Sequence, residues 1–251
     1  MSTPRAPVEE YGEQYFQQYN YADRPLGRLS MYWFARRYYA AMVRRYAPRP
    51  RGRLLEMGCG LGHLLGLLQD DFECTGVDLA GYCVEQSRLN APRARAVLLD
   101  AGDLSAFEDG SYSVVVALHL VEHLPDPSAT LRDVTRLLEP GGLLLLATPN
   151  PDYALRRRKD PGSDAIGKDP THINVQPPAF WRALLEANGY RIARHWGDGL
   201  WDVPYVPVLP KALQFALFGL PALVQVVTRT SLIPVRSGVN QIIAAYRLGA
   251  S

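Results

Sequence analysis

The sequence predicts an α/β fold in which a mostly parallel sheet is covered by helices on both faces. Short apolar runs alternate with segments of helical periodicity from residue 53 onward, as in strand–helix–strand units. The runs at residues 111–119 and 143–150 are strongly apolar, which is typical of strands buried on both faces. A glycine-rich turn directly follows the first run. These three observations favour an open sheet with a ligand site where its strands end.

The glycine-rich turn joins a strand predicted at residues 53–57 to a helix predicted at residues 61–69. Gly58, Gly60 and Gly62 alternate in this turn, and glycine is needed where the backbone takes φ > 0 or approaches a ligand closely. The helix then points unpaired N–H groups at whatever lies over the turn. This arrangement is typical of a nucleotide site, although an ordinary strand–helix turn would also explain the glycines.

Acidic residues stand at or near the ends of the first three strands. A strand, a helix and a strand follow the turn, at residues 73–78, 80–90 and 96–100. Glu56 precedes the glycines, and Asp78 and Asp100 end the second and third strands. Because right-handed crossovers bring the carboxyl ends of parallel strands to one edge, we expect these carboxylates to converge on one crevice.

The rest of the chain continues the alternation and adds one long insertion. Strands are predicted at residues 111–119, 143–150, 190–196 and 240–248, and helices at residues 128–138 and 178–188. Residues 151–170 read as a loop near the strand ends, with a solvated basic cluster at 156–159, and are placed to act as a substrate lid. Residues 203–235 are apolar with a helical core near 213–227. A cap over an apolar substrate pocket is the favoured use of this insertion, with a membrane-surface patch and a homodimer face as alternatives.

Four motifs together identify a family resemblance. The first reads E-x-G-x-G-x-G from Glu56 to Gly62, and it departs from G-x-G-x-x-G because His63 follows. The others are Asp-Ala-Gly-Asp-Leu at 100–104, Val-Glu-His-Leu-Pro-Asp at 121–126 and Leu-Glu-Pro-Gly-Gly at 138–142. Across residues 50–195 the chain resembles the class I S-adenosylmethionine-dependent methyltransferases of the small-molecule type. The resemblance implies a Rossmann-like, doubly wound, mostly parallel seven-stranded sheet whose last strand is antiparallel and inserted before the sixth.

The resemblance also implies a domain division and a cofactor site. Residues 1–50 would form an N-terminal aromatic and basic helical arm, and residues 51–251 the methyltransferase domain with its apolar insertion at 203–235. The cofactor would be S-adenosylmethionine, leaving as S-adenosylhomocysteine. The residues expected to hold it are Glu56, Gly58, Gly60, Gly62, Asp78, Leu79, Leu118, either Asp103 with Leu104 or Asp100, and Tyr15 or Tyr19 from the arm. Asp103 is favoured for adenine, and the other aspartate would then cap a turn.

Three histidines are candidates for the catalytic role. His172 lies in Asp-Pro-Thr-His-Ile-Asn at residues 169–174, a segment that many methyltransferases of this type share. Its near-neutral intrinsic pKa suits a general base or a ligand holder, while a purely structural hydrogen bond is the alternative. His119 and His123 flank the end of the strand at 111–119 and would orient a substrate, accept its proton or serve as scaffold. We expect no metal, because no His, Asp or Glu cluster shows ligand spacing.

The implied reaction is an in-line methyl transfer to a small molecule, at oxygen or nitrogen and with an apolar, natural-product-like body in view of residues 203–235. Alignment and exclusion of water would supply most of the catalysis. A non-catalytic S-adenosylmethionine-binding or nucleotide-binding module is the alternative. An NAD(P)-dependent oxidoreductase is disfavoured by the glycine spacing and by the lack of a Tyr-x-x-x-Lys pair.

Composition narrows the classes of partner and compartment. The chain has 251 residues, 47% of them hydrophobic, which predicts one large globular domain. A net charge of only +2 argues against a nucleic-acid binder. Three cysteines without a C-x-x-C pair, and a start without an apolar signal core, favour a reduced cytoplasmic protein with no zinc site. We expect no transmembrane span, since no run approaches about 20 apolar residues.

The N-terminal region combines aromatic and basic residues. Tyr15 and Tyr19 lie in a polar arm, and residues 28–47 predict a helix that carries five arginines among aromatics. A solvated face over a core contact is the favoured interpretation. Contact with an acidic membrane surface or with an anionic substrate are the alternatives.

Overall fold

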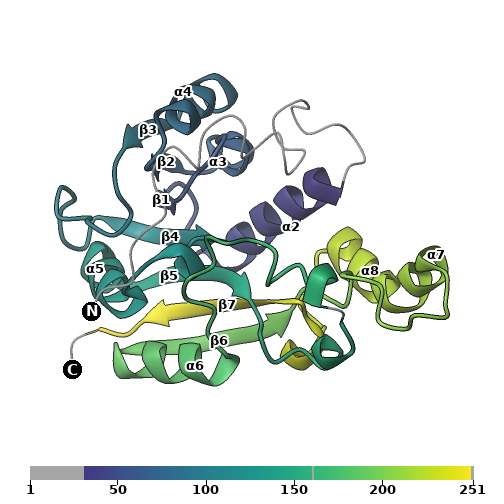
Figure 1. The fold of residues 1–251 in the computed structure, drawn as a ribbon. Coiled ribbons are helices and arrows are strands. Elements are labelled where there is room, and N and C mark those ends of the chain that lie inside the picture. The colour runs from purple at the N-terminus through teal and green to yellow at the C-terminus, as the bar shows by residue number, and fades with distance from the viewer. Residues whose placement is uncertain (1–30, 160, 250–251) are drawn as a thin grey trace.

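The computed structural model describes residues 31–159 and 161–249 and contains one seven-stranded sheet (Figure 1). The strand order is β3-β2-β1-β4-β5-β7-β6. Its strands are β1 Arg53–Met57, β2 Glu73–Asp78, β3 Arg95–Leu98, β4 Tyr112–Leu118, β5 Leu138–Pro149, β6 Tyr190–Gly197 and β7 Asn240–Arg247. All pairings are parallel except those of β7 with β5 and β6, so the expected antiparallel last strand is confirmed.

Helices cover both faces of the sheet and divide the core into two layers. They are α2 Met31–Tyr46, α3 His63–Leu68, α4 Gly81–Asn90, α5 Pro127–Leu137 and α6 Pro178–Ala187. Alternate residues of β4 separate the layers, because successive strand side chains point to opposite faces. Val114 and Val116 pack with α2 and α3, whereas Val115 and Ala117 pack with α5 and α6. Figure 1 shows α2 and α3 on one side of the sheet and α6 on the other.

The helix predicted at residues 28–47 is α2, and it packs into the core. Tyr38 and Met42 are buried against β4 and β5. On the outer side Arg44 donates to a carboxylate oxygen of Asp71 at 2.8 Å, as expected for a solvated face over a core contact. Residues 1–30, with the candidates Tyr15 and Tyr19, lie outside the described residues, so the domain division at residue 50 stays a prediction.

The basic cluster at residues 156–159 is not simply solvated, which corrects the prediction. The Lys159 ammonium is buried, lies 3.1 Å from the Asp202 carboxylate and donates to the Asp202 carbonyl at 2.6 Å. Arg156 donates to Asp164 at 3.2 Å. A small apolar cluster of Tyr153, Ile166, Tyr205 and Val239 lies beside these ion pairs. The loop is therefore tied to the start of the 203–235 insertion.

The insertion contains one continuous 18-residue helix, made of α7 Lys211–Gln214, the π-turn η5 Phe215–Gly219 and α8 Leu220–Thr228. Its two glutamines face inward. Gln214 is buried and bonds to the backbone of Tyr205, Val206 and Leu209, and Gln225 is buried and bonds to Gly197, Leu232 and Ile233.

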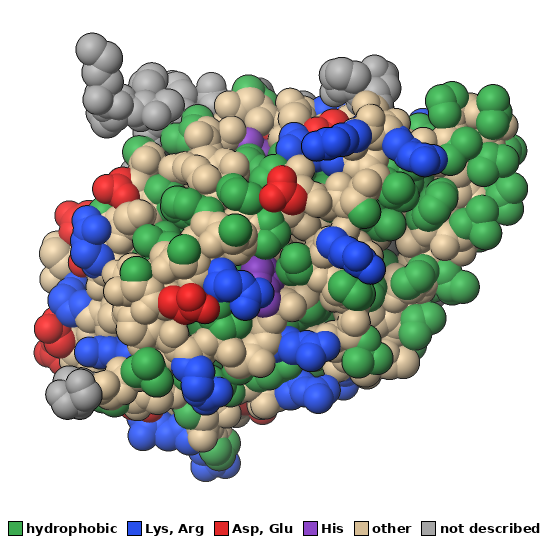
Figure 2. Space-filling view, turned by 90° about the horizontal axis from the view of Figure 1, so that it is seen from below, with side chains coloured by type: hydrophobic (Ala, Val, Ile, Leu, Met, Phe, Trp, Pro, Cys, Tyr) green, Lys and Arg blue, Asp and Glu red, His purple; other side chains and the backbone are tan. Residues whose placement is uncertain are grey.

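The outer face of this helix is apolar and exposed. Its exposed side chains are Leu213, Phe215, Leu217, Leu220, Val224 and Val227. Figure 2 shows apolar side chains gathered at this end of the molecule, with Lys and Arg beside them. By length and composition the helix is long and apolar enough to cross a membrane, which corrects the expectation that no segment is. Gln214, Pro221 and Gln225 interrupt the apolar run in the sequence, so a criterion of about 20 consecutive apolar residues does not detect this helix.

Candidate functional site

The glycine turn after β1 folds as the sequence predicts. Gly58, Gly60 and Gly62 have φ of 65°, 51° and 75°, a region that L side chains rarely adopt. A Cβ on Gly62 would also collide with the backbone and side chain of Ser87 on α4. The turn is therefore specified by its glycines and leaves backbone N–H groups at the start of α3.

Asp78 at the end of β2 holds the turn in place. Its carboxylate accepts from the N–H of Gly60 at 2.8 Å and from the N–H of Ala80 at 3.0 Å. Burial raises the pKa of Asp78, and these backbone donors oppose the rise. Asp78, one of the residues expected to hold the cofactor, thus lies against the glycine turn, as the strand order requires.

Glu56 is buried near the carboxyl end of β1, just before the glycine turn. Among the described residues no group donates a hydrogen bond to its Oε2. Burial raises the pKa of Glu56 to about 8, the Arg36 guanidinium on α2 pulls it back, and Asp78 adds to the rise. A buried carboxyl with an open oxygen fits the ammonium of an amino-acid group, because that partner would supply the missing donor and charge.

The two adenine candidates both lie after β3, which ends at Leu98, before the predicted residue 100. Asp100 accepts from the N–H of Gly102 at 2.6 Å, and Asp103 accepts from the N–H of Ser105 at 3.1 Å. Asp103 is fully exposed and its pKa is lowered by the hydrogen bonds from Ser105. Both aspartates therefore form turns, and the choice of Asp103 over Asp100 stays a prediction.

The three leucine candidates occupy different environments around the crevice. Leu104 is fully buried under α5, on the face that β1 and β4 share. Leu118 ends β4 on the opposite face, and Leu79 follows Asp78 in a half-buried position. A role toward the cofactor stays a prediction for each of them.

The far side of the crevice begins where β4 ends. His119 has φ of 53°, and its ring lies 3.5 Å from the hydroxyl of Tyr39 on α2 and 3.5 Å from Oε1 of Glu122. Glu122 belongs to the short helix η2 Val121–His123 and is fully buried. The hydroxyl of Thr148 on β5 donates to Oε2 of Glu122 at 3.1 Å. Burial would raise the pKa of Glu122, but the imidazoles of His119 and His123 hold it below its usual value.

The segment at residues 169–174 packs directly against η2. The Thr171 hydroxyl donates to Asp169, and Nδ1 of His123 lies 2.9 Å from that hydroxyl oxygen and 3.1 Å from the Thr171 carbonyl. Asn174 donates to the Leu124 carbonyl at 2.9 Å. The rings of His123 and His172 lie 5.0 Å apart. The structure therefore brings together all three predicted histidines.

Hydrogen-bond chemistry fixes the tautomers of two of these histidines. Because the Thr171 hydroxyl proton is committed to Asp169, Nδ1 of His123 must donate the proton between them. Nδ1 of His172 lies 2.8 Å from the Ile166 carbonyl, which can only accept. A ring that donates through Nδ1 and carries one proton has its lone pair on Nε2. Burial lowers the pKa of His123 and favours this neutral form.

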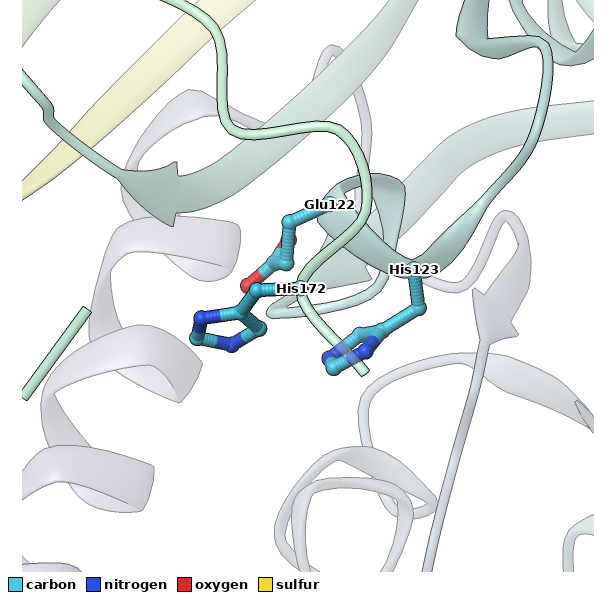
Figure 3. Close-up of side chains that lie close together, drawn as sticks. All are labelled: Glu122, His123 and His172. Atoms are coloured by element: carbon cyan, nitrogen blue, oxygen red, sulfur yellow. The ribbon is translucent and has the colours of Figure 1, made fainter. Parts of the chain in front are cut away.

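Sequence reasoning missed two features of this region. Tyr39 touches His119, but the aromatics of the helix at 28–47 gave no signal beyond packing. Glu122, His123 and His172 each offer a ligand atom within 4.8 Å of the others (Figure 3). This cluster departs from the expectation of no metal-ligand grouping, because His123 and His172 are 49 positions apart in the sequence and show no ligand spacing.

Comparisons with known proteins agree with this geometry. Residues 32–195 match a family model described as a methyltransferase domain. A ubiquinone biosynthesis O-methyltransferase of Xanthomonas oryzae pv. oryzae is 38% identical over 104 residues, which cover 39% of this chain and 43% of that protein. A probable S-adenosylmethionine-dependent methyltransferase of Mycolicibacterium smegmatis is 33% identical over 64% of this chain and 60% of its own length. The matches thus span less than two thirds of these relatives.

Solved structures share the fold. A putative methyltransferase of Haloferax volcanii, solved in complex with a methyltransferase activator, aligns with a TM-score of 0.63 at 20% identity, covering 94% of this chain and 97% of that one. An S-adenosylmethionine-dependent methyltransferase of Archaeoglobus fulgidus aligns with a TM-score of 0.57 at 20% identity over 87% of this chain and all of that one. At these identities the likeness shows the fold alone.

Proposed function

Because this chain belongs to the class I S-adenosylmethionine-dependent methyltransferases, we propose that it methylates a hydroxyl oxygen of a small molecule with an apolar body. S-adenosylmethionine supplies a methyl group on a sulfonium, which is already activated. The new carbon–oxygen bond uses a lone pair of the acceptor oxygen, the carbon–sulfur bond breaks with its electrons on sulfur, and the hydroxyl proton leaves. The protein's task is alignment, exclusion of water and disposal of that proton.

The residues of the glycine turn fit the cofactor. The backbone N–H groups of the turn and the carboxylate of Asp78 would hold its polar groups, and Glu56 would pair with its amino group. The orphaned Oε2 of Glu56 and the positive φ values of the glycines support this assignment. Tyr32 and Arg36 of α2 would close the crevice from above, since Tyr32 lies 3.2 Å from His63 and Arg36 acts on Glu56.

The observation that carries the choice of oxygen is the histidine cluster at the end of β4. A hydroxyl must lose its proton to be methylated, and neutral imidazoles with lone pairs on Nε2 can accept a hydrogen bond from it. The bonds of Nδ1 in His123 to Thr171 and of Nδ1 in His172 to Ile166 make Nε2 the accepting atom of each ring in its one-proton form. The printed name of the Xanthomonas relatives, an O-methyltransferase, supports the same choice.

The apolar body of the acceptor follows from the insertion. Tyr205 and Phe218 of the insertion pack near Ile166, whose carbonyl orients His172. The inner side of the insertion would therefore cap the acceptor, while its exposed apolar face would rest on a lipid surface that delivers it. Lys211 and Arg229 flank the helix at either end and would meet anionic headgroups.

Matched acceptors test both parts of the proposal. The protein is incubated with S-adenosylmethionine carrying a labelled methyl group and a para-alkyl phenol, the corresponding para-alkyl aniline or the unsubstituted phenol. We expect label on the oxygen of the alkyl phenol, with kcat/KM at least ten times that for phenol. Label on the aniline alone would contradict O-methylation, and equal rates for the two phenols would contradict the apolar body.

A further inference from the structure

We propose that Glu122, His123 and His172 bind one divalent transition-metal ion on the acceptor side of the site. One potential ligand atom from each residue lies within 4.8 Å of the other two. Figure 3 shows Glu122 and His123 projecting from η2 and His172 reaching the same region from the loop. Ligands bound at about 2.1 Å to a common ion in tetrahedral geometry lie about 3.4 Å apart, so the three atoms must approach one another by up to about 1.4 Å when the ion binds.

The Glu122 carboxylate is the first sign of a missing cation. Its side chain is 0% exposed, and Oε1 makes no hydrogen bond with a described residue. Nδ1 of His119 lies 3.5 Å from Oε1, at the outer limit of a hydrogen bond, and offsets part of the cost of burying the carboxylate. A buried carboxylate with an open oxygen is costly, and a bound cation would remove that cost.

The surroundings of the two histidines are the second sign. Metal-binding imidazoles usually donate their other N–H to a carbonyl or a carboxylate-linked group, which fixes ring orientation and tautomer. His172 lies with Nδ1 on the Ile166 carbonyl, and His123 lies with Nδ1 on Thr171, which donates to Asp169. In the one-proton form of each ring Nε2 is then the atom that can coordinate an ion, and Oδ2 of Asp169, 3.9 Å from Nε2 of His172, adds negative charge beside it. This is the outer shell that a metal site requires.

The donor set selects the kind of ion. Two imidazole nitrogens and one carboxylate favour Zn²⁺, Fe²⁺, Co²⁺ or Mn²⁺, whereas Mg²⁺ and Ca²⁺ prefer oxygen ligands alone. Three protein ligands leave coordination positions open for a hydroxyl. A metal there would occupy the Nε2 lone pairs, so the histidines would act as its ligands and not as the hydrogen-bond acceptors of the hydroxyl. The ion would lower the pKa of that hydroxyl and favour loss of its proton to water. That role rests on the proposed function, but binding of the ion does not.

Cobalt is the probe for the experiment, because Co²⁺ reports nitrogen and oxygen coordination in its visible spectrum. Chelator-treated full-length protein is titrated with CoCl₂, followed by absorbance and by calorimetry. We expect one equivalent to bind, with the affinity reduced at least 10-fold in His123→Ala, His172→Ala and Glu122→Gln. His195→Ala is the matched control, because His195 lies on β6 and bonds to Gln241. Its affinity for Co²⁺ should equal that of the wild type.

If a histidine variant fails to fold, Glu122→Gln alone tests the metal site. Gln keeps the side-chain volume and can still accept a hydrogen bond from Thr148. The proposal is overturned if the folded wild type takes up no Co²⁺, or if uptake is the same in Glu122→Gln and the wild type. Methyl transfer is assayed separately on the same preparation. Stoichiometric cobalt uptake without methyl transfer would support the metal site and contradict the proposed function. Full methyl transfer without cobalt uptake would overturn the metal site alone.

Discussion

The candidate site has two parts that are built in different ways. We call the glycine turn, Glu56 and Asp78 the cofactor side, and Glu122, His123, Thr171 and His172 the acceptor side. On the cofactor side, the Asp78 carboxylate holds Gly60, 18 positions away, through a backbone N–H. On the acceptor side, His123 meets Thr171 across 48 positions, and Thr148 meets Glu122 across 26, through side chains. The first side depends on backbone geometry that glycine specifies locally. The second exists only after the sheet has assembled, so it can vary without disturbing the first.

The largest expected effect comes from breaking the cofactor side. Gly62→Ala places a Cβ at φ 75° against Ser87, so the turn must distort. We expect the affinity for S-adenosylmethionine in calorimetry to fall at least 100-fold. Gly110→Ala is the matched control, because Gly110 has φ of 61° but its Cβ would meet nothing within 4 Å. That variant should lose about 1 kcal/mol of stability and no affinity; equal losses of affinity in both would contradict the comparison.

A substitution at Glu56 tests whether this residue lowers the stability of the ligand-free protein while it favours cofactor binding. Its folded pKa of about 8 lies above the ordinary 4.5, so the stability that the neutral form contributes is complete below pH 4.5 and is lost as pH rises toward 8. At pH 7 the ligand-free wild type should therefore be less stable than Glu56→Gln by on the order of 3 kcal/mol.

Urea unfolding of both proteins from pH 4.5 to pH 8 measures this difference. S-adenosylmethionine should stabilise the wild type much more than the variant, because the amide cannot pair with an ammonium as a charge. If Glu56→Gln is no more stable than the wild type at pH 7, burial of the Glu56 carboxylate does not destabilise the ligand-free protein. If it binds S-adenosylmethionine as well as the wild type does, Glu56 does not pair with the cofactor.

The acceptor side should respond in the rate of transfer and not in cofactor affinity. Thr171→Val removes the hydroxyl between Asp169 and His123, so the ring loses its fixed tautomer. We expect kcat for the acceptor to fall about 10-fold with the dissociation constant of S-adenosylmethionine unchanged. Thr135→Val, which removes a hydroxyl bonded to Leu131 on α5, is the control and should change neither value. If Thr171→Val also lowered the affinity for S-adenosylmethionine, the cofactor side and the acceptor side would be coupled, which contradicts the prediction.

The geometry of the glycine turn and Asp78 could be predicted from the sequence, for a physical reason. Glycines at 58, 60 and 62 and an acid at 78 act within one strand–helix–strand unit, so their pattern predicts their geometry. The sheet order also followed, apart from the ends of β3 and β5. The Glu122, His123 and His172 cluster could not be read as one site, because its distances depend on how the loop at 169–174 meets η2.

The expectation that no segment is long and apolar enough to span a membrane was wrong for a related reason. Gln214 and Gln225 look like interruptions of an apolar helix until the structure shows that they are buried in loop backbone. Lys159 likewise reads as solvated until Asp202 is brought to it. In each case a polar residue found its partner through tertiary structure, which periodicity alone does not report.

The smallest expected effect concerns the exposed face of the insertion, the part of the acceptor side farthest from the chemistry. Leu217, 57% exposed, would lose water contact on a lipid surface, so Leu217→Gln should weaken sedimentation with anionic phospholipid vesicles about 5-fold. Leu89→Gln on α4 is the matched control, since Leu89 is 73% exposed and lies on the cofactor side. Vesicle binding that both substitutions weaken equally, or a dimer that Leu217→Gln dissociates in light scattering, would assign this face to something other than lipid. If only Leu217→Gln weakens vesicle binding, the histidine cluster and a lipid-binding face belong to the same side of the site. The cofactor side then depends only on the local backbone geometry of the glycine turn.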